Sequence, residues 1–188
     1  MLPEVSTFFR HYARGWLILV LLVGFVLFEA ATLPWLQRVP GGSIAPLDAR
    51  FFYTPEEALS VARGYGDARR FWIGAYLTWD MANPVFYTLI LVLAISWLFR
   101  EGVAPESWTQ RLNLVPIGAG VCDVLENLAI VSLLTAYPAR LRGIAWLSTA
   151  LTISKFCFLG ASLALVVLGA SRAAITRLSG KRSSVGRV

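Results

Sequence analysis

Five charged side chains stand inside long apolar stretches of this sequence: Glu29, Asp80, Asp123, Glu126 and Lys155. A charge near the centre of a bilayer costs roughly 2.5–3.5 kcal/mol on insertion scales, so such groups face one another or a wet cavity. A carboxyl group kept neutral by a low dielectric can donate a proton, or bind the amine or hydroxyl of a ligand. We expect Asp80 and Glu126 to face a ligand, and Asp123 to hold Lys155 or to share a proton.

Polar residues recur at the helical period in three of the apolar stretches. The first stripe contains Tyr76, Asp80, Asn83 and Tyr87, the second Asp123, Glu126 and Asn127, and the third Ser148, Thr152, Lys155 and Ser162. Steps of three, four and seven residues place side chains on one face of a helix. We therefore expect the three stripes to meet and, with Glu29, to line a funnel that opens toward the first loop.

Structural roles for the same residues stay open. Glu29 lies near a helix end and can extend to the membrane interface. Asp80 and Asn83 can bind backbone groups that Pro84 leaves without a donor. The charged group on the last two helices can be a buried ion pair that fixes helix register.

The composition indicates a membrane protein of one domain. Of 188 residues, 57% are hydrophobic and 15% are charged, and the mean hydropathy is +0.64. A soluble domain is more polar, so the excess apolar surface needs lipid to cover it. We expect an all-α fold: an integral membrane four-helix bundle over residues 1–171, with spans at about 16–36, 68–99, 112–137 and 143–170. Residues 172–188 are expected to form a basic, disordered tail.

The first loop is expected to be ordered. Thr54 can cap a helix, Pro55 suits its first position, and Glu57 stands where a capping box requires an acid. The two glycines at Gly64 and Gly66 favour an end to this short helix. The second span should exceed the bilayer thickness, since its 32 residues rise about 48 Å, and Pro84 should kink it.

The sequence gives little support for a metal or a cofactor. Cys122 and Cys157 lie far apart within apolar stretches, and His11 is the single histidine. Metal sites need closer-spaced Cys or His, so we expect no metal ligands and no cofactor. Because no nucleophile–base pair is apparent, whether the chain is an enzyme stays open. Ala119 and Gly120 are typical of close helix packing.

The distribution of charge predicts the orientation in the membrane. Nine Lys and Arg residues fall on the side of the termini and seven on the side of the first loop. This bias favours cytoplasmic termini, and the preference for Arg over Lys suggests a bacterial inner membrane. A basic tail next to a membrane helix binds anionic headgroups more readily than nucleic acid, so we expect lipid partners and no nucleic acid.

Two segments resemble the EXPERA group, which includes the sigma-two receptor and the sterol isomerases. Its smaller members have four helices, an acid late in the first helix, and an acid shortly before a proline in the second. Glu29 before Pro34, and Asp80 before Pro84, are similar. The resemblance implies a lipid- or sterol-sized pocket between helices, opening sideways. The Asp123–Asn127 motif and Lys155 do not match that group, and the histidines of the isomerases are absent.

These observations favour a polytopic membrane protein that binds, or acts on, a lipid-like or small amphipathic ligand. The candidate ligand-binding residues are Glu29, Tyr76, Asp80, Asn83, Tyr87, Asp123, Glu126, Asn127 and Lys155. A non-catalytic accessory subunit of a larger membrane complex is the alternative, in which the polar cluster only holds helices together. A proton- or cation-coupled carrier is the third, because intramembrane carboxylates serve in relays. A homo-oligomer is compatible with each.

Overall fold

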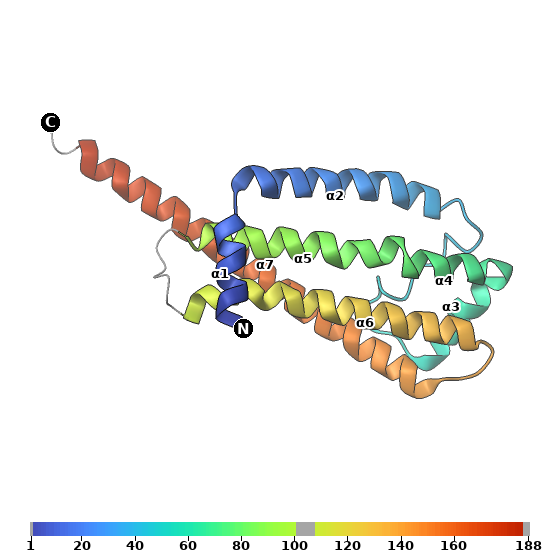
Figure 1. Cartoon of the computed structure of the whole chain (residues 1–188). Coiled ribbons are helices and arrows are strands. Elements are labelled where there is room, and N and C mark those ends of the chain that lie inside the picture. The colour runs from blue at the N-terminus through green and yellow to red at the C-terminus, as the bar shows by residue number, and fades with distance from the viewer. Residues whose placement is uncertain (1, 101–107, 186–188) are drawn as a thin grey trace.

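Four helical segments are long and apolar enough to cross a membrane, over Gly15–Leu36, Gly66–Leu98, Trp108–Ala136 and Arg142–Ile175. The computed structural model describes residues 2–100 and 108–185, with side chains up to residue 175. Within these residues the chain is helical without strands, and both ends of the chain lie at the same end of an elongated bundle (Figure 1). The predicted all-α membrane bundle is confirmed.

The helices follow one another in an up-and-down order. They are α1 (Leu2–Tyr12), α2 (Gly15–Leu36), α3 (Pro55–Gly64), α4 (Arg69–Leu77), α5 (Trp79–Leu98), α6 (Val115–Ala136) and α7 (Arg142–Val185). Short 3-10 turns, η1 (Gly66–Ala68) and η2 (Trp108–Leu114), precede α4 and α6. The long helices α6 and α7 pack extensively against each other, whereas α2 lies against α5 at the side of the bundle (Figure 1).

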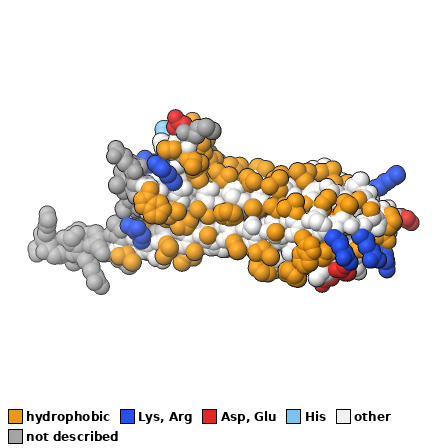
Figure 2. All heavy atoms as spheres, turned by 90° about the horizontal axis from the view of Figure 1, so that it is seen from below, with side chains coloured by type: hydrophobic (Ala, Val, Ile, Leu, Met, Phe, Trp, Pro, Cys, Tyr) orange, Lys and Arg blue, Asp and Glu red, His pale blue; other side chains and the backbone are white. Residues whose placement is uncertain are grey.

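Exposed tryptophans mark two levels along the bundle. Trp16, Trp97 and Trp108 lie near the end that carries the termini, and Trp35 and Trp146 lie near the first loop. Trp16 and Trp35 are both on α2, and 19 residues of helix rise about 28 Å. That separation fits the ~30 Å hydrocarbon slab, at whose two surfaces tryptophan is enriched. Apolar side chains cover the middle of the face shown in Figure 2.

The first loop is an ordered cap, as expected. Thr54 accepts a hydrogen bond from the backbone of Glu57, and the Glu57 side chain accepts one from the backbone of Thr54, which completes the capping box of α3. The ring of Tyr65 stacks on that of Trp72 with centroids 4.8 Å apart. The Trp72 indole donates to the carbonyl of Pro40 at 2.9 Å, so the loop is joined to α4.

Three features differ from the sequence-based expectations. The second span is not one continuous helix, because Thr78 interrupts it with φ −119° and ψ −79°, whereas Pro84 lies inside α5. The Thr78 hydroxyl donates to the Gly74 carbonyl at 2.8 Å, and such back-bonding bends helices. The helix α1 was not expected. Helix α7 continues past the expected end at Ala170 to Val185, so the backbone of the basic tail is helical to that point.

Candidate functional site

A buried ion cluster joins α6 and α7 near the middle of the bundle. Lys155 Nζ lies 3.1 Å from Asp123 Oδ1 and 2.7 Å from Glu126 Oε2. The side chain of Lys155 is 7% exposed, and that of Glu126 is fully buried. Breaking such a pair costs more than forming it gains, because the remaining charge has no water around it. The expected contact between Asp123 and Lys155 is present.

Neighbouring hydroxyls complete the coordination of both carboxylates. The Tyr87 hydroxyl donates to Asp123 Oδ2 at 2.8 Å, and the Thr152 hydroxyl donates to Glu126 Oε1 at 2.6 Å. Three of the four carboxylate oxygens therefore accept a hydrogen bond, and the fourth, Glu126 Oε2, has the ion pair with Lys155. The stripes predicted on the second, third and fourth spans do meet, since Tyr87, Asp123 and Lys155 belong to α5, α6 and α7.

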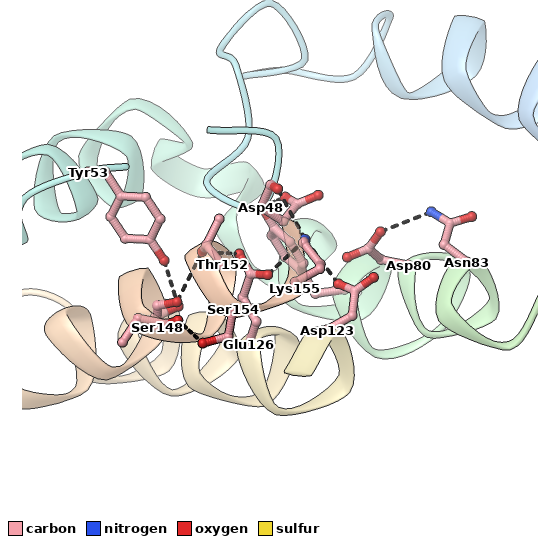
Figure 3. Close-up of polar contacts among 12 residues, drawn as sticks. Asp48, Tyr53, Asp80, Asn83, Asp123, Glu126, Ser148, Thr152, Ser154 and Lys155 are labelled. Atoms are coloured by element: carbon pink, nitrogen blue, oxygen red, sulfur yellow. Dashed lines mark hydrogen bonds and ion pairs between the residues drawn. The ribbon is translucent and has the colours of Figure 1, made fainter. Parts of the chain in front are cut away.

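Asp48 in the first loop also belongs to this cluster. Lys155 Nζ donates to the Asp48 backbone carbonyl at 3.2 Å, in addition to its hydrogen bond to Asp123 and its ion pair with Glu126. The Tyr76 hydroxyl donates to Asp48 Oδ1 at 2.9 Å. Burial raises the pKa of the Asp48 carboxyl, although the Lys155 ammonium beside it acts in the opposite direction. Figure 3 shows Asp48 and Lys155 side by side.

Sequence reasoning missed Asp48, because a loop has no period from which the direction of its side chains can be read. It also missed Tyr53, whose hydroxyl donates to Ser148 Oγ at 2.6 Å. Thr149 in turn donates to the Tyr53 carbonyl at 2.7 Å. These contacts show that the first loop descends between the helices and binds the polar face of α7.

Next to the ion cluster lies a cavity, here called the acidic pocket, with a volume of about 190 Å³. It lies between α2, the first loop and the α4–α5 segment. Three acids from these elements line it, namely Glu29, Asp48 and Asp80. The remaining lining residues are Phe28, Thr32, Leu33, Leu36, Pro46, Ala49, Trp72, Ala75, Tyr76, Trp79 and Asn83.

Two buried oxygens in the acidic pocket have no hydrogen-bond partner. Asn83 Nδ2 donates to Asp80 Oδ1 at 3.1 Å, which leaves Asp80 Oδ2 and Asn83 Oδ1 free. Asp80 and Asn83 lie on one side of Lys155, and Glu126 lies on the other (Figure 3). Buried acceptors of this kind are normally satisfied by protein groups or by ordered water, so these two atoms are open to a donor from a water or a ligand.

The interruption at Thr78 positions these two residues. Asp80 stands in the first turn of α5, where a carboxylate is favoured by the helix dipole. Pro84, four residues later, has no N–H with which to bind the Asp80 carbonyl. Among the described residues, no side chain caps this helix start, and the Asn83 amide binds Asp80 rather than the backbone.

The structure separates the predicted site residues into two groups. Tyr87, Asp123, Glu126 and Lys155 form the ion cluster, and Glu29, Tyr76, Asp80 and Asn83 line the acidic pocket. Glu126 does not line this pocket. Asn127 is fully buried and neither its amide nitrogen nor its oxygen has a partner.

The acidic pocket offers oxygen atoms that can bind a ligand. Among the described residues, no group of three or more His, Cys, Asp and Glu side chains could hold a metal ion. Cys122 and Cys157 are free thiols. Asp80, Asn83 and Glu29 supply hydrogen-bond acceptors and negative charge next to aromatic walls.

No family model, no curated protein and no solved structure matches this chain. Function is therefore inferred from the fold and from the arrangement of the side chains. They show a membrane protein with four apolar spans and a buried cluster of Lys155 with Asp and Glu side chains.

Proposed function

We propose that this membrane protein binds a small amphipathic, lipid-like ligand in the acidic pocket. The observation that carries the proposal is the pair of buried oxygens without partners, Asp80 Oδ2 and Asn83 Oδ1, in a cavity with an apolar wall. A buried acceptor left without a donor costs about 1–3 kcal/mol, so a ligand that supplies an N–H or O–H donor gains that energy on binding.

The walls of the acidic pocket fit a molecule with one polar end. Phe28 and Leu33 of α2, and Trp79 of α5, supply apolar and aromatic surface. Asp80 and Asn83 supply acceptors for an amine or a hydroxyl. The volume of about 190 Å³ suits a headgroup or a small amphipathic molecule and is smaller than a whole phospholipid.

A route from the bilayer is consistent with the position of α2. None of the residues of α2 is buried, so the helix is flanked by lipid on most of its surface. Because Phe28 and Leu33 form the α2 side of the pocket, an amphipathic molecule dissolved in the bilayer reaches this wall without crossing water.

The ion cluster has a supporting role in this proposal. Lys155 holds the Asp48 carbonyl, and the Asp48 side chain is part of the pocket wall. Asp80 and Asn83 are then the residues that face the ligand. Glu126 does not line the pocket and stabilises Lys155 through their ion pair.

Native mass spectrometry of the full chain, gently extracted and offered a total lipid extract, tests the proposal. We expect the wild type to retain a small molecule, and Asp80→Asn to reduce its occupancy about tenfold, the equivalent of roughly 1.4 kcal/mol. Asp67→Asn is the matched control, because Asp67 is exposed and outside the acidic pocket. Its occupancy should equal that of the wild type.

Several outcomes would overturn the proposal. Equal ligand occupancy in the wild type and Asp80→Asn would place the ligand outside the acidic pocket. A wild type that retains no small molecule would contradict ligand binding altogether. A larger complex that co-purifies without a small molecule would support the accessory subunit instead. Proton or cation flux in liposomes, abolished by Asp80→Asn, would support the carrier.

A further inference from the structure

Helix α1 lies across the bundle at the end that carries both termini (Figure 1). One of its faces is fixed to the protein. The Ser6 side chain is buried and its hydroxyl donates to Asn113 Oδ1 at 2.8 Å. The Asn113 amide donates back to the Ser6 carbonyl at 3.2 Å. This reciprocal pair holds α1 against η2, so its other faces have fixed directions.

A second face of α1 is apolar and exposed. Val5, Phe8 and Tyr12 are 39%, 57% and 51% exposed. Their steps of three and four residues form one stripe. The rings of Phe8 and Tyr12 touch, with centroids 4.8 Å apart. A contiguous exposed apolar stripe of this kind is typical of a surface that contacts a membrane or another protein.

A third face is polar and lies on the other exposed side. Glu4, Thr7 and His11 are exposed and follow the same steps of three and four. At 3.6 residues per turn, this stripe is centred about 100° from the apolar one. Figure 2 shows this segment, marked by the pale blue histidine, projecting from the side of the bundle, with hydrophobic side chains where it meets the bundle. This division of faces is typical of helices that lie in a membrane interface.

The described side chains at this end of the bundle are mainly basic. The arginines here are Arg10, Arg14, Arg100, Arg111 and Arg172. Within the described part of the chain, Glu4 is the acidic residue at this end. Arg100 Nη1 donates to the Ala13 carbonyl at 3.0 Å and so secures the junction between α1 and α2. Each basic residue near a lipid surface adds about 1 kcal/mol of attraction to anionic headgroups.

We propose that α1 and the arginines around it form a binding surface for anionic phospholipids of the adjacent leaflet. Val5, Phe8 and Tyr12 enter the boundary between headgroups and acyl chains, and Arg14 and Arg111 contact lipid phosphates at the same level. The occupant is the leaflet itself, because the exposed apolar stripe lies among basic side chains whose charge complements that of anionic headgroups. This surface lies at the opposite end from the first loop and is independent of the acidic pocket.

The depth of α1 is tested with spin labels on the full chain in lipid nanodiscs. Cys122→Ala with Cys157→Ser removes both native thiols, and Phe8→Cys and Thr7→Cys then carry the label singly. We expect the label at residue 8 to collide with oxygen more than with a water-soluble nickel chelate, and the label at residue 7 to show the reverse. Equal exposure of both labels to the nickel chelate would overturn the proposal. Shielding of residue 8 from both reagents would overturn it also, because protein would then cover the stripe.

The lipid preference is tested with the same nanodiscs. Spin-labelled phosphatidylglycerol and phosphatidylcholine report how many lipids of each kind the protein immobilises. We expect a preference for phosphatidylglycerol that falls about fivefold with Arg14→Gln and again with Arg111→Gln. Arg63→Gln, an exposed arginine on α3 at the other end, is the control and should keep the preference. No preference in the wild type, or an equal loss in the control, would contradict an anionic site at α1.

Discussion

Lys155 on α7 donates a hydrogen bond to the backbone carbonyl of Asp48, which lies 107 residues earlier in the first loop. The same ammonium group forms ion pairs with Asp123 and Glu126 of α6. One side chain therefore joins two membrane helices and the loop that closes the bundle. The acidic pocket lies beside this junction, so its shape depends on Lys155 although Lys155 does not line it.

Replacing Lys155 with Met should destabilise the protein by about 3–5 kcal/mol, because Asp123 and Glu126 lose their buried counter-ion. Equilibrium unfolding in detergent would measure the loss. The triple variant Lys155→Met, Asp123→Asn, Glu126→Gln should recover most of it, since the two carboxylates that form ion pairs with Lys155 are then replaced by neutral amides. A single variant as stable as the wild type would mean that the cluster is hydrated and does not hold the helices.

Gly120 allows α6 to approach α5 closely. A Cβ atom at Gly120 would stand 2.5 Å from Thr88 Oγ1, closer than atoms pack. Gly120→Ala should therefore cost about 1–3 kcal/mol in unfolding free energy, because overpacking forces the helices apart. Gly160→Ala on α7 is the matched control. Apart from the local backbone of its own helix and its chain neighbours, no atom of the described residues lies within 4 Å of a Cβ added there. Equal stability of the two variants would show that α5 can shift without cost.

Much of this architecture could be predicted from the sequence. Four spans follow from length and hydropathy, and the polar stripes that hold Tyr87, Asp123 and Lys155 follow from the helical period. The role of Gly120 in close helix packing could also be predicted. Asp48 was not, because its direction is set by contacts with Tyr76 and Lys155 that only the folded chain brings together.

Two further differences have local physical reasons. The break at Thr78 depends on a hydroxyl that bonds backward to Gly74, and the same residue in another setting continues a helix. Helix α1 is too short and too polar to be detected as a span. Its stripe of Val5, Phe8 and Tyr12 was nevertheless readable as an amphipathic helix.

Asp48 should make stability depend on pH. Burial raises the pKa of this carboxyl above its ordinary value of 3.8. Between the ordinary and the raised value the folded state binds more protons than the unfolded state, so this contribution to stability is lost as the pH rises. Asp48→Asn keeps the acceptor for Tyr76 but does not titrate.

Unfolding of both proteins at several pH values from about 4 to about 8 measures this effect. The stability of the wild type relative to Asp48→Asn should fall as the pH rises through this window. Titrating groups remote from Asp48 act in both proteins and cancel in the difference, so the difference reports Asp48 together with the groups that interact with it. A difference that is constant across the window would show that Asp48 titrates as it does in the unfolded chain.

The capping box of α3 should respond to pH in the opposite direction. Hydrogen bonds from the backbone and side chain of Thr54 lower the pKa of the Glu57 carboxyl below its ordinary value of 4.5. Its contribution is present above that value and is lost as the pH falls through the lowered pKa. Hydrogen exchange of the α3 amides, corrected for the intrinsic effect of pH, should therefore report less protection in acid. Glu57→Gln should remove this dependence, whereas Thr54→Ala should reduce protection at every pH, since the cap acceptor is gone. If the wild type and Glu57→Gln lost protection in parallel, the acid response would have to come from another group.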